Sequence, residues 1–289
     1  MKDQVLIATA YEDTVRIYAA LTTQTVETAR QIHDTWPTAT AALGRTLSGT
    51  LMMGLMNDAV YRLTVRFNGD GPLGEILAVS NEKGVVKGYV NEPHIDLELN
   101  ELGKLDVAGA IGSGQITVIK DIGLKEPYHG IVPLQTGEIA EDLAYYFTKS
   151  EQTPSAVALG VLIEPDGSVK TAGGFMIQLM PGATEDTSLY LEKRLSEIPP
   201  VSNLLSQSQK SIDIIIGVLG EEIPVKILEE IEVGFRCDCS SEKFKGPLLS
   251  LGNDELQEIL VERGEIEVKC HFCNKVYHYR ESDLGGVEC

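Results

Sequence analysis

The sequence is poor in basic residues and has no long apolar run. Its 289 residues include 24 lysines and arginines against 43 aspartates and glutamates, a formal net charge of −19. Because proteins gain affinity for nucleic acid by neutralising phosphates with lysine and arginine, this balance argues against a nucleic-acid partner. No apolar stretch is long enough to span a bilayer, and the first residues do not form a secretory leader. We therefore expect no nucleic-acid partner and no membrane partner.

Cysteine is also scarce, and it is unevenly distributed. There are five cysteines, and four of them fall in two tight pairs. A secreted protein held by disulfides would be expected to have an even number of cysteines spread along the chain. The reducing cytoplasm is the better interpretation, and paired cysteines there bind metals or undergo redox chemistry more often than they form structural disulfides.

The apolar pattern predicts an α+β protein in three parts. Residues 1–182 alternate between strand-like and helix-like runs, which predicts a mixed α/β core domain. Residues 183–232 are rich in Glu, Ser and Leu with helical periodicity, which predicts a helical linker docked on a neighbouring surface; residues 223–231 are expected to form one of its helices. Residues 233–289 have few large apolar side chains, and a unit this small usually needs a metal, disulfides or a partner to fold.

Two sets of apolar residues in the first part bear on packing. A leucine at every fourth position within residues 38–56 predicts the buried face of a helix rather than a ligand surface. Methionine suits surfaces that bind varied partners, but core packing is the favoured interpretation for both methionine groups. These groups are Met52, Met53 and Met56 in that helix, and Met176 and Met180 before the linker.

The paired cysteines predict a metal site. A Cys-x-Cys motif, Cys237 and Cys239, and a Cys-x-x-Cys motif, Cys270 and Cys273, are separated by thirty residues. Four thiolates in two close pairs suit the tetrahedral, sulfur-rich coordination that Zn²⁺ favours, so we expect one Zn²⁺ per chain at these four residues. A mixed Cys/His site with His271 or His278 is the less favoured alternative. Cys289 has no partner motif and is expected to be a free thiol.

The same spacing supports a redox hypothesis. Thiolates are the form of cysteine that oxidants attack, so an oxidant would join Cys237 to Cys239 and Cys270 to Cys273 in two local disulfides and release the metal. A disulfide between residues two apart is geometrically tight, and strained disulfides are easily reduced again. The alternative is a purely structural zinc site, which differs from the switch only in its redox behaviour.

The sequence lacks the common catalytic motifs. It has no P-loop, no His-Glu-x-x-His and no Gly-x-Ser-x-Gly motif, and the glycine-rich stretch at 109–114 is too weak to indicate a phosphate site. A catalytic zinc needs an open coordination position, and four thiolates leave none. We therefore do not expect an enzyme.

Two further segments carry a resemblance to a known family. Residues 128–143 read YHGIVPLQTGEIAEDL, and Tyr146 is followed by the sequence SEQTP at residues 150–154. Together with the two cysteine motifs, these segments resemble the bacterial redox-regulated heat-shock chaperones, the family of the thirty-three-kilodalton heat-shock protein. The order of parts agrees with that family over essentially the whole length.

The resemblance implies an ATP-independent holdase of the cytoplasm that protects unfolding client proteins from aggregation during oxidative and heat stress. It implies that the zinc-bound, reduced form is inactive. Oxidation together with partial unfolding would release the zinc, loosen the linker at 183–232 and expose apolar surface, and the activated protein would form a homodimer. Clients and the second copy would bind the core domain. The alternative function is that of a zinc-ribbon protein with purely structural zinc, with or without binding of nucleic acid.

Overall fold

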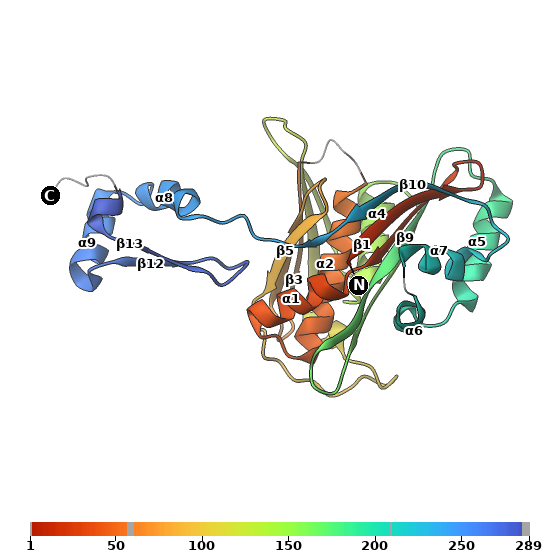
Figure 1. The fold of residues 1–289 in the computed structure, drawn as a ribbon, viewed down its shortest axis with the longest axis horizontal. Coiled ribbons are helices and arrows are strands. Elements are labelled where there is room, and N and C mark those ends of the chain that lie inside the picture. The colour runs from red at the N-terminus through yellow and green to blue at the C-terminus, as the bar shows by residue number, and fades with distance from the viewer. Residues whose placement is uncertain (1, 57–60, 209, 285–289) are drawn as a thin grey trace. The chain divides into compact units, whose positions relative to one another are not determined.

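The computed structural model describes residues 2–56, 61–208 and 210–284, and the chain divides into two compact units, Met1–Phe235 and Arg236–Cys289 (Figure 1). Both units mix helices and strands, which confirms the predicted class. Within the described ranges, no helix combines the length and the apolar character needed to cross a membrane.

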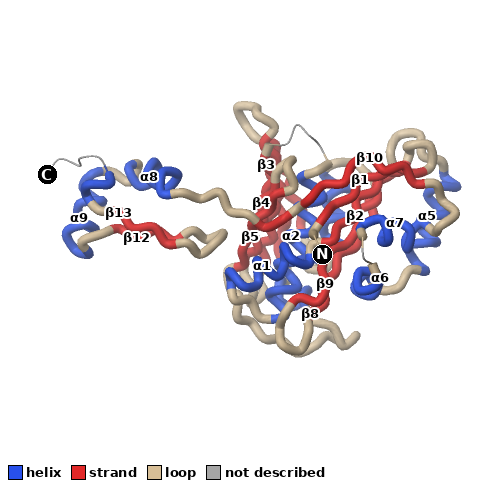
Figure 2. The backbone as a smooth tube through the Cα atoms, in the orientation of Figure 1, coloured by secondary structure: helices blue, strands red, loops and turns tan. Residues whose placement is uncertain are grey.

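A five-stranded antiparallel sheet forms one layer of the first unit (Figure 2). Its strands, in spatial order, are β10 (Val225–Glu232), β1 (Gln4–Ala10), β2 (Val15–Leu21), β9 (Val169–Leu179) and β8 (Ser155–Ile163). Successive side chains of a strand point to opposite faces. Val5 and Ile7 of β1 accordingly belong to one buried cluster, and Leu6 and Ala8 belong to another. The sheet is therefore covered on both faces.

A six-stranded sheet forms the second layer of this unit. Its strands, in spatial order, are β11 (Gly234–Phe235), β5 (Val85–Val90), β4 (Glu75–Ser80), β3 (Arg62–Gly69), β6 (Gly114–Asp121) and β7 (Tyr128–Pro133). Only the short β11 runs parallel to its neighbour, β5; the other pairs are antiparallel.

Helix α2 (Pro37–Gly54) packs against strands of both sheets and is the centre of the larger core. Helices α1 (Thr23–His33), α3 (Val107–Ile111) and α4 (Ile139–Ser150) lie around it. The predicted leucine face is buried, with Leu43, Leu47, Leu51 and Leu55 between 0% and 6% exposed. Met52, Met53 and Met176 are also buried in the core, so the favoured packing interpretation is confirmed for these three.

Three helices cover the other face of the five-stranded sheet: α5 (Glu185–Glu197), α6 (Val201–Gln207) and α7 (Ser211–Leu219). Their apolar side chains form what we call the docking cluster with side chains of β1, β2 and β9. Its fully buried helix residues are Leu191, Leu204, Leu205, Ile214, Ile215, Val218 and Leu219. A hydrogen bond joins two of the helices, because the hydroxyl of Tyr190 on α5 donates to the carbonyl oxygen of Leu219 on α7 at 3.0 Å. This part of the predicted linker is thus helical and packed on a sheet.

The helix predicted for residues 223–231 is wrong, because this segment forms strand β10. It pairs antiparallel with β1 from Gln4↔Glu232 to Ala10↔Val225. Its glutamates and leucine favour a helix locally, but β1 offers an open row of main-chain donors and acceptors. Strand preference depends strongly on such tertiary context.

The second unit is small. It contains α8 (Ser241–Leu249), α9 (Asn253–Arg263), a hairpin of β12 (Ile266–Lys269) and β13 (Val276–Tyr279), and a 3₁₀ turn at Glu281–Leu284. Five side chains form its buried cluster in the described residues: Leu248, Leu256, Ile266, Tyr279 and Leu284. A core of this size supplies little of the free energy needed to fold a chain of more than forty residues.

Candidate metal centre

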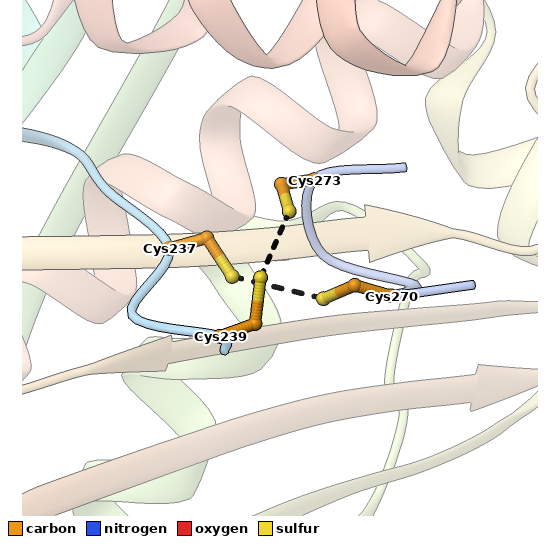
Figure 3. A group of neighbouring side chains, drawn as sticks. All are labelled: Cys237, Cys239, Cys270 and Cys273. Carbon is orange, nitrogen blue, oxygen red and sulfur yellow. Dashed lines mark hydrogen bonds between the residues drawn. The ribbon is translucent and has the colours of Figure 1, made fainter. Parts of the chain in front are cut away.

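The four paired cysteines come from two short segments of the second unit. Cys237 and Cys239 lie in the extended segment that precedes α8, and Cys270 and Cys273 lie in the turn between β12 and β13. Two main-chain hydrogen bonds close this turn, from Cys270 N to Lys275 O at 2.9 Å and from Asn274 N to Cys270 O at 2.8 Å. Figure 3 shows the four side chains converging on one point.

The sulfur positions match a tetrahedral metal site. All four Sγ atoms lie within 4.8 Å of one another. The Sγ atoms of Cys237 and Cys270 are 3.7 Å apart, and those of Cys239 and Cys273 are 3.3 Å apart. A zinc–sulfur bond of about 2.3 Å places the corners of a tetrahedron about 3.8 Å apart. The thiols are reduced in this arrangement, because a disulfide would bring two sulfurs to about 2.05 Å. The four residues therefore fit a metal ion with four sulfur ligands.

The surroundings fix Cys239 in particular. The hydroxyl of Tyr277, on β13, lies 3.1 Å from its Sγ and donates a hydrogen bond to its carbonyl oxygen at 3.1 Å. The ring of Phe244, on α8, packs against the ring of Tyr277 with centroids 5.4 Å apart. Cys270 is buried, and the other three cysteines are partly exposed. The site is thus held by packing on one side and open to small solutes on the other.

The thiols differ in how readily they ionise. Burial opposes ionisation of Cys239, but hydrogen bonds from Tyr277 and from the neighbouring thiols outweigh burial and lower the pKa of Cys239 to about 7. Burial raises the pKa of Cys237 and of Cys273. Cys239 therefore loses its proton more readily than Cys237 or Cys273, and a thiolate is the form that binds metal.

Neither histidine of this region joins the sulfur group. Nδ1 of His278 lies 3.0 Å from a carboxylate oxygen of Glu265, across the β12–β13 hairpin. The group of potential ligands contains the four cysteines and not His271 or His278. Cys289 lies outside the described residues. Tyr277 is absent from the residues predicted from sequence, because no motif links a tyrosine four positions after Cys273 to a sulfur of the other pair.

The glycine-rich stretch at 109–114 has a packing role. A Cβ atom on Gly114 would lie 2.0 Å from the carbonyl oxygen of Asn68, and one on Gly69 would lie 1.9 Å from that of Ile111. Two backbone segments meet here too closely for side chains. This close approach accounts for the glycines, and no phosphate-binding role is needed to explain them.

Comparison with known proteins gives matches over nearly the whole chain. Residues 3–280 match the model of the family described as Hsp33 protein. The chain is 48% identical over 285 residues to a 33 kDa chaperonin of Enterococcus faecalis, covering 98% of this chain and 95% of the relative. It is also 48% identical to the 33 kDa chaperonin of Geobacillus kaustophilus, covering 98% and 97%. The crystal structure of the 33 kDa chaperonin of Thermotoga maritima superposes with a TM-score of 0.91 at 39% identity, covering 99% of this chain and 98% of that one.

Proposed function

The chain belongs to the Hsp33 family, and we propose on that basis that it is an ATP-independent holdase chaperone switched by the redox state of its four clustered cysteines. The observation that carries the proposal is the convergence of these sulfurs, at tetrahedral distances, in a unit with a very small core. Such a unit links the state of four thiols to the folding of a whole segment.

Zinc is the metal that the donor set favours. Four thiolates form a soft, sulfur-only site, and tetrahedral sulfur coordination is typical of Zn²⁺ in proteins. Cys237, Cys239, Cys270 and Cys273 would hold one ion per chain in the reduced protein. The ion would keep all four sulfurs as thiolates and tie the β12–β13 turn to the segment before α8, and four ligands leave no position for catalysis.

Oxidation is the proposed signal. One peroxide molecule takes two electrons from Cys237 and Cys239, and a second takes two from Cys270 and Cys273. Each step forms one sulfur–sulfur bond, breaks one oxygen–oxygen bond and leaves two hydroxide ions, which are protonated to water. The two disulfides no longer offer four thiolates, so the ion is released. Pairing within each motif separates the two segments, whereas pairing between motifs would keep them joined.

Loss of the metal would unfold the second unit. Structural zinc contributes about 10–16 kcal/mol in small zinc-finger peptides, so metal binding and folding are coupled there. The five buried side chains of this unit are too few to replace that contribution. Residues 233–289 therefore act as the sensor in the proposed three-part division, which has a core at 1–182 and a linker at 183–232.

Undocking of the linker would provide the client surface. The docking cluster covers an apolar face of the five-stranded sheet that includes Leu6, Ile17 and Phe175. Helices α5 to α7 leave this face if the linker loosens, and the face then offers apolar area to unfolding proteins. Clients bind there in this proposal, the activated protein forms a homodimer through the core, and the protein works in the cytoplasm. The net charge of −19 does not support nucleic-acid binding, and so it does not support a zinc-ribbon protein that acts on nucleic acid.

The test combines zinc release with client protection. The reduced, zinc-loaded protein is treated with peroxide at heat-shock temperature, zinc is followed with a chromogenic chelator, and aggregation of a heat-denatured client is followed by light scattering. We expect zinc release and suppressed scattering only after oxidation, both reversed by reductant. A protein that keeps its zinc, or loses it without protecting the client, would have a structural metal site.

Peptide mapping then tests the disulfide assignment. Mass spectrometry of the oxidised protein should find Cys237 joined to Cys239 and Cys270 joined to Cys273. Cys239 and Cys273 belong to different motifs and their sulfurs are 3.3 Å apart in the reduced protein, so the alternative pairing is sterically accessible. Finding disulfides between the motifs would contradict the proposed unfolding of the second unit.

A further inference from the structure

The two edges of the five-stranded sheet differ in character. Strand β10 carries Lys226, Glu229, Glu230 and Glu232, whereas β8 reads SAVALGVLI and has no charged residue. Charged side chains on an edge strand discourage pairing with another chain, and an uncharged, apolar edge strand invites it. The β8 edge therefore lacks the protection that the β10 edge has.

The β8 edge also has unused main-chain groups. In the sheet order, β8 has β9 as its only strand neighbour among the described residues. Alternate N–H and C=O groups of β8 point toward β9, and the others point away from the sheet. These outward groups are a ready set of donors and acceptors for an added strand.

A groove of about 760 Å³ runs beside the second half of this strand, Leu159–Ile163. One wall is the start of α6, at Val201 and Ser202, and the other is formed by Leu99 and Leu105. Leu99 is 60% exposed, so apolar surface is already available on that wall. Helix α6 belongs to the docking cluster side of the sheet and α2 to the opposite side, and both line the groove, which places its opening along the sheet edge.

The net charge of the residues that line the groove bears on which kind of segment can bind there. Arg45 and Lys104 are balanced by Glu164 and Asp166 among the lining residues, so the local charge is 2 − 2 = 0 in a chain of net charge −19. A neutral, apolar segment meets no charge penalty there. A second copy carries a net charge of −19 over its whole surface, so long-range repulsion opposes its approach more than that of an uncharged segment.

We propose that the β8 edge binds an extended, uncharged apolar segment of an unfolding client as an additional antiparallel strand. This inference rests on the proposed chaperone function and adds a second client contact, at the edge of the sheet whose face the linker helices cover. It also connects the edge to the switch, because a Cβ on Gly160 would lie 2.8 Å from Cγ1 of Val201 and 3.2 Å from the amide of Ser202. Undocking of α6 removes this wall and opens the part of the strand beside the groove, Leu159–Ile163.

Hydrogen exchange tests the added strand directly. The oxidised full-length protein is mixed with carboxymethylated α-lactalbumin, a permanently unfolded protein, and amide exchange is measured by mass spectrometry. We expect the peptide covering residues 155–163 to gain protection when the probe binds. The peptide covering residues 225–232, on the charged edge, should not change.

A pair of lysine variants supplies the functional test. Leu162→Lys puts a charge on β8 beside the groove, and Leu228→Lys puts one on β10, where Leu228 is 44% exposed. We expect Leu162→Lys to weaken binding of the probe about tenfold and Leu228→Lys to leave it unchanged. Zinc content and circular dichroism of the reduced variants check folding, and the exchange experiment on the unaltered chain stands if Leu162→Lys does not fold.

Three outcomes would overturn the proposal. Unchanged exchange at residues 155–163 with full client protection would place the client elsewhere. Protection of these residues on oxidation alone, increasing with protein concentration, would make the edge a contact between two copies. If the oxidised protein neither binds the probe nor suppresses aggregation, the chaperone function itself fails, and the inference fails with it.

Discussion

The hydroxyl of Tyr277 lies 3.1 Å from Sγ of Cys239 and donates a hydrogen bond to the carbonyl oxygen of the same residue. The two residues are 38 positions apart in the chain. This contact therefore joins the segment before α8 to the β12–β13 hairpin independently of any metal. Partners that orient a ligand from outside the coordination sphere commonly tune metal affinity.

Replacing Tyr277 with phenylalanine removes this contact and leaves all four sulfurs in place. We expect Tyr277→Phe to bind one zinc ion per chain with about tenfold lower affinity, because the orientation of Cys239 is no longer fixed. Competition with a chelator of known zinc affinity measures the change.

Tyr279→Phe is the matched control for this variant. Tyr279 lies on the same strand and donates its hydroxyl hydrogen bond to the carbonyl of Ser241 at 2.7 Å, not to a cysteine. We expect Tyr279→Phe to lower the stability of the second unit and to have a smaller effect on the zinc affinity measured by chelator competition. Equal zinc affinity in Tyr277→Phe and the unaltered protein would show that the hydroxyl has no influence on the site.

Replacing one ligand should unfold the second unit alone. Cys270 is only 3% exposed, and Cys270→Ser removes one of the four sulfurs. Since structural zinc contributes about 10–16 kcal/mol in comparable small units, we expect residues 236–284 to become sensitive to protease in the reduced protein while residues 2–235 resist it. Cys289→Ser should keep one zinc per chain. Retention of zinc by Cys270→Ser would exclude the four-sulfur site.

The candidate metal site was predictable because its information is local. A Cys-x-Cys and a Cys-x-x-Cys motif each bring two sulfurs together within one turn. Once the β12–β13 hairpin holds the second pair, the four sulfurs can be arranged around one point in few ways. The leucine face of α2 was predictable for the same reason, since a spacing of four residues defines one side of a helix.

The features that sequence did not predict depend on distant partners. Strand β10 forms because β1, more than 200 positions earlier, has an open edge, and nothing within Val225–Glu232 indicates that edge. The contact of Tyr277 with Cys239 requires the hairpin to fold back on the segment before α8. Helix α7 is defined by packing on the sheet through Ile214 and Ile215, which the linker sequence alone does not reveal.

The acid stability of the first unit should depend on Glu27. Its carboxylate accepts two hydrogen bonds from Arg30 and one from the amide of Val169, which joins α1 to β9. The hydrogen bonds from Arg30, together with that amide, lower the pKa of Glu27 from 4.5 to about 2. A carboxyl with a depressed folded-state pKa stabilises the protein above its unfolded-state pKa, so this contribution is lost as the pH falls from 4.5 toward 2.

Glu27→Gln should therefore be about 2 kcal/mol less stable than the unaltered protein at neutral pH, with the difference narrowing below pH 4.5. Urea unfolding followed through Trp36, the single tryptophan of the chain, reports on this unit. Glu164→Gln is the control, because its ion pair with Lys170 is solvent-exposed and contributes little. A constant difference between Glu27→Gln and the unaltered protein at all pH values would contradict the assignment.

Breaking the docking cluster should activate the protein without an oxidant. Ile215 is 1% exposed and Ile216, the next residue of α7, is 38% exposed, so aspartate at the first position is buried and aspartate at the second reaches solvent. Because an unpaired buried charge is very costly, Ile215→Asp should release the linker helices. We expect this variant, reduced and with its zinc bound, to bind a hydrophobic dye and suppress client aggregation, while Ile216→Asp stays inactive until oxidised. If Ile215→Asp binds the dye but protects no client, the sheet face beneath the linker is not the client surface, and the second unit must control activity by another route.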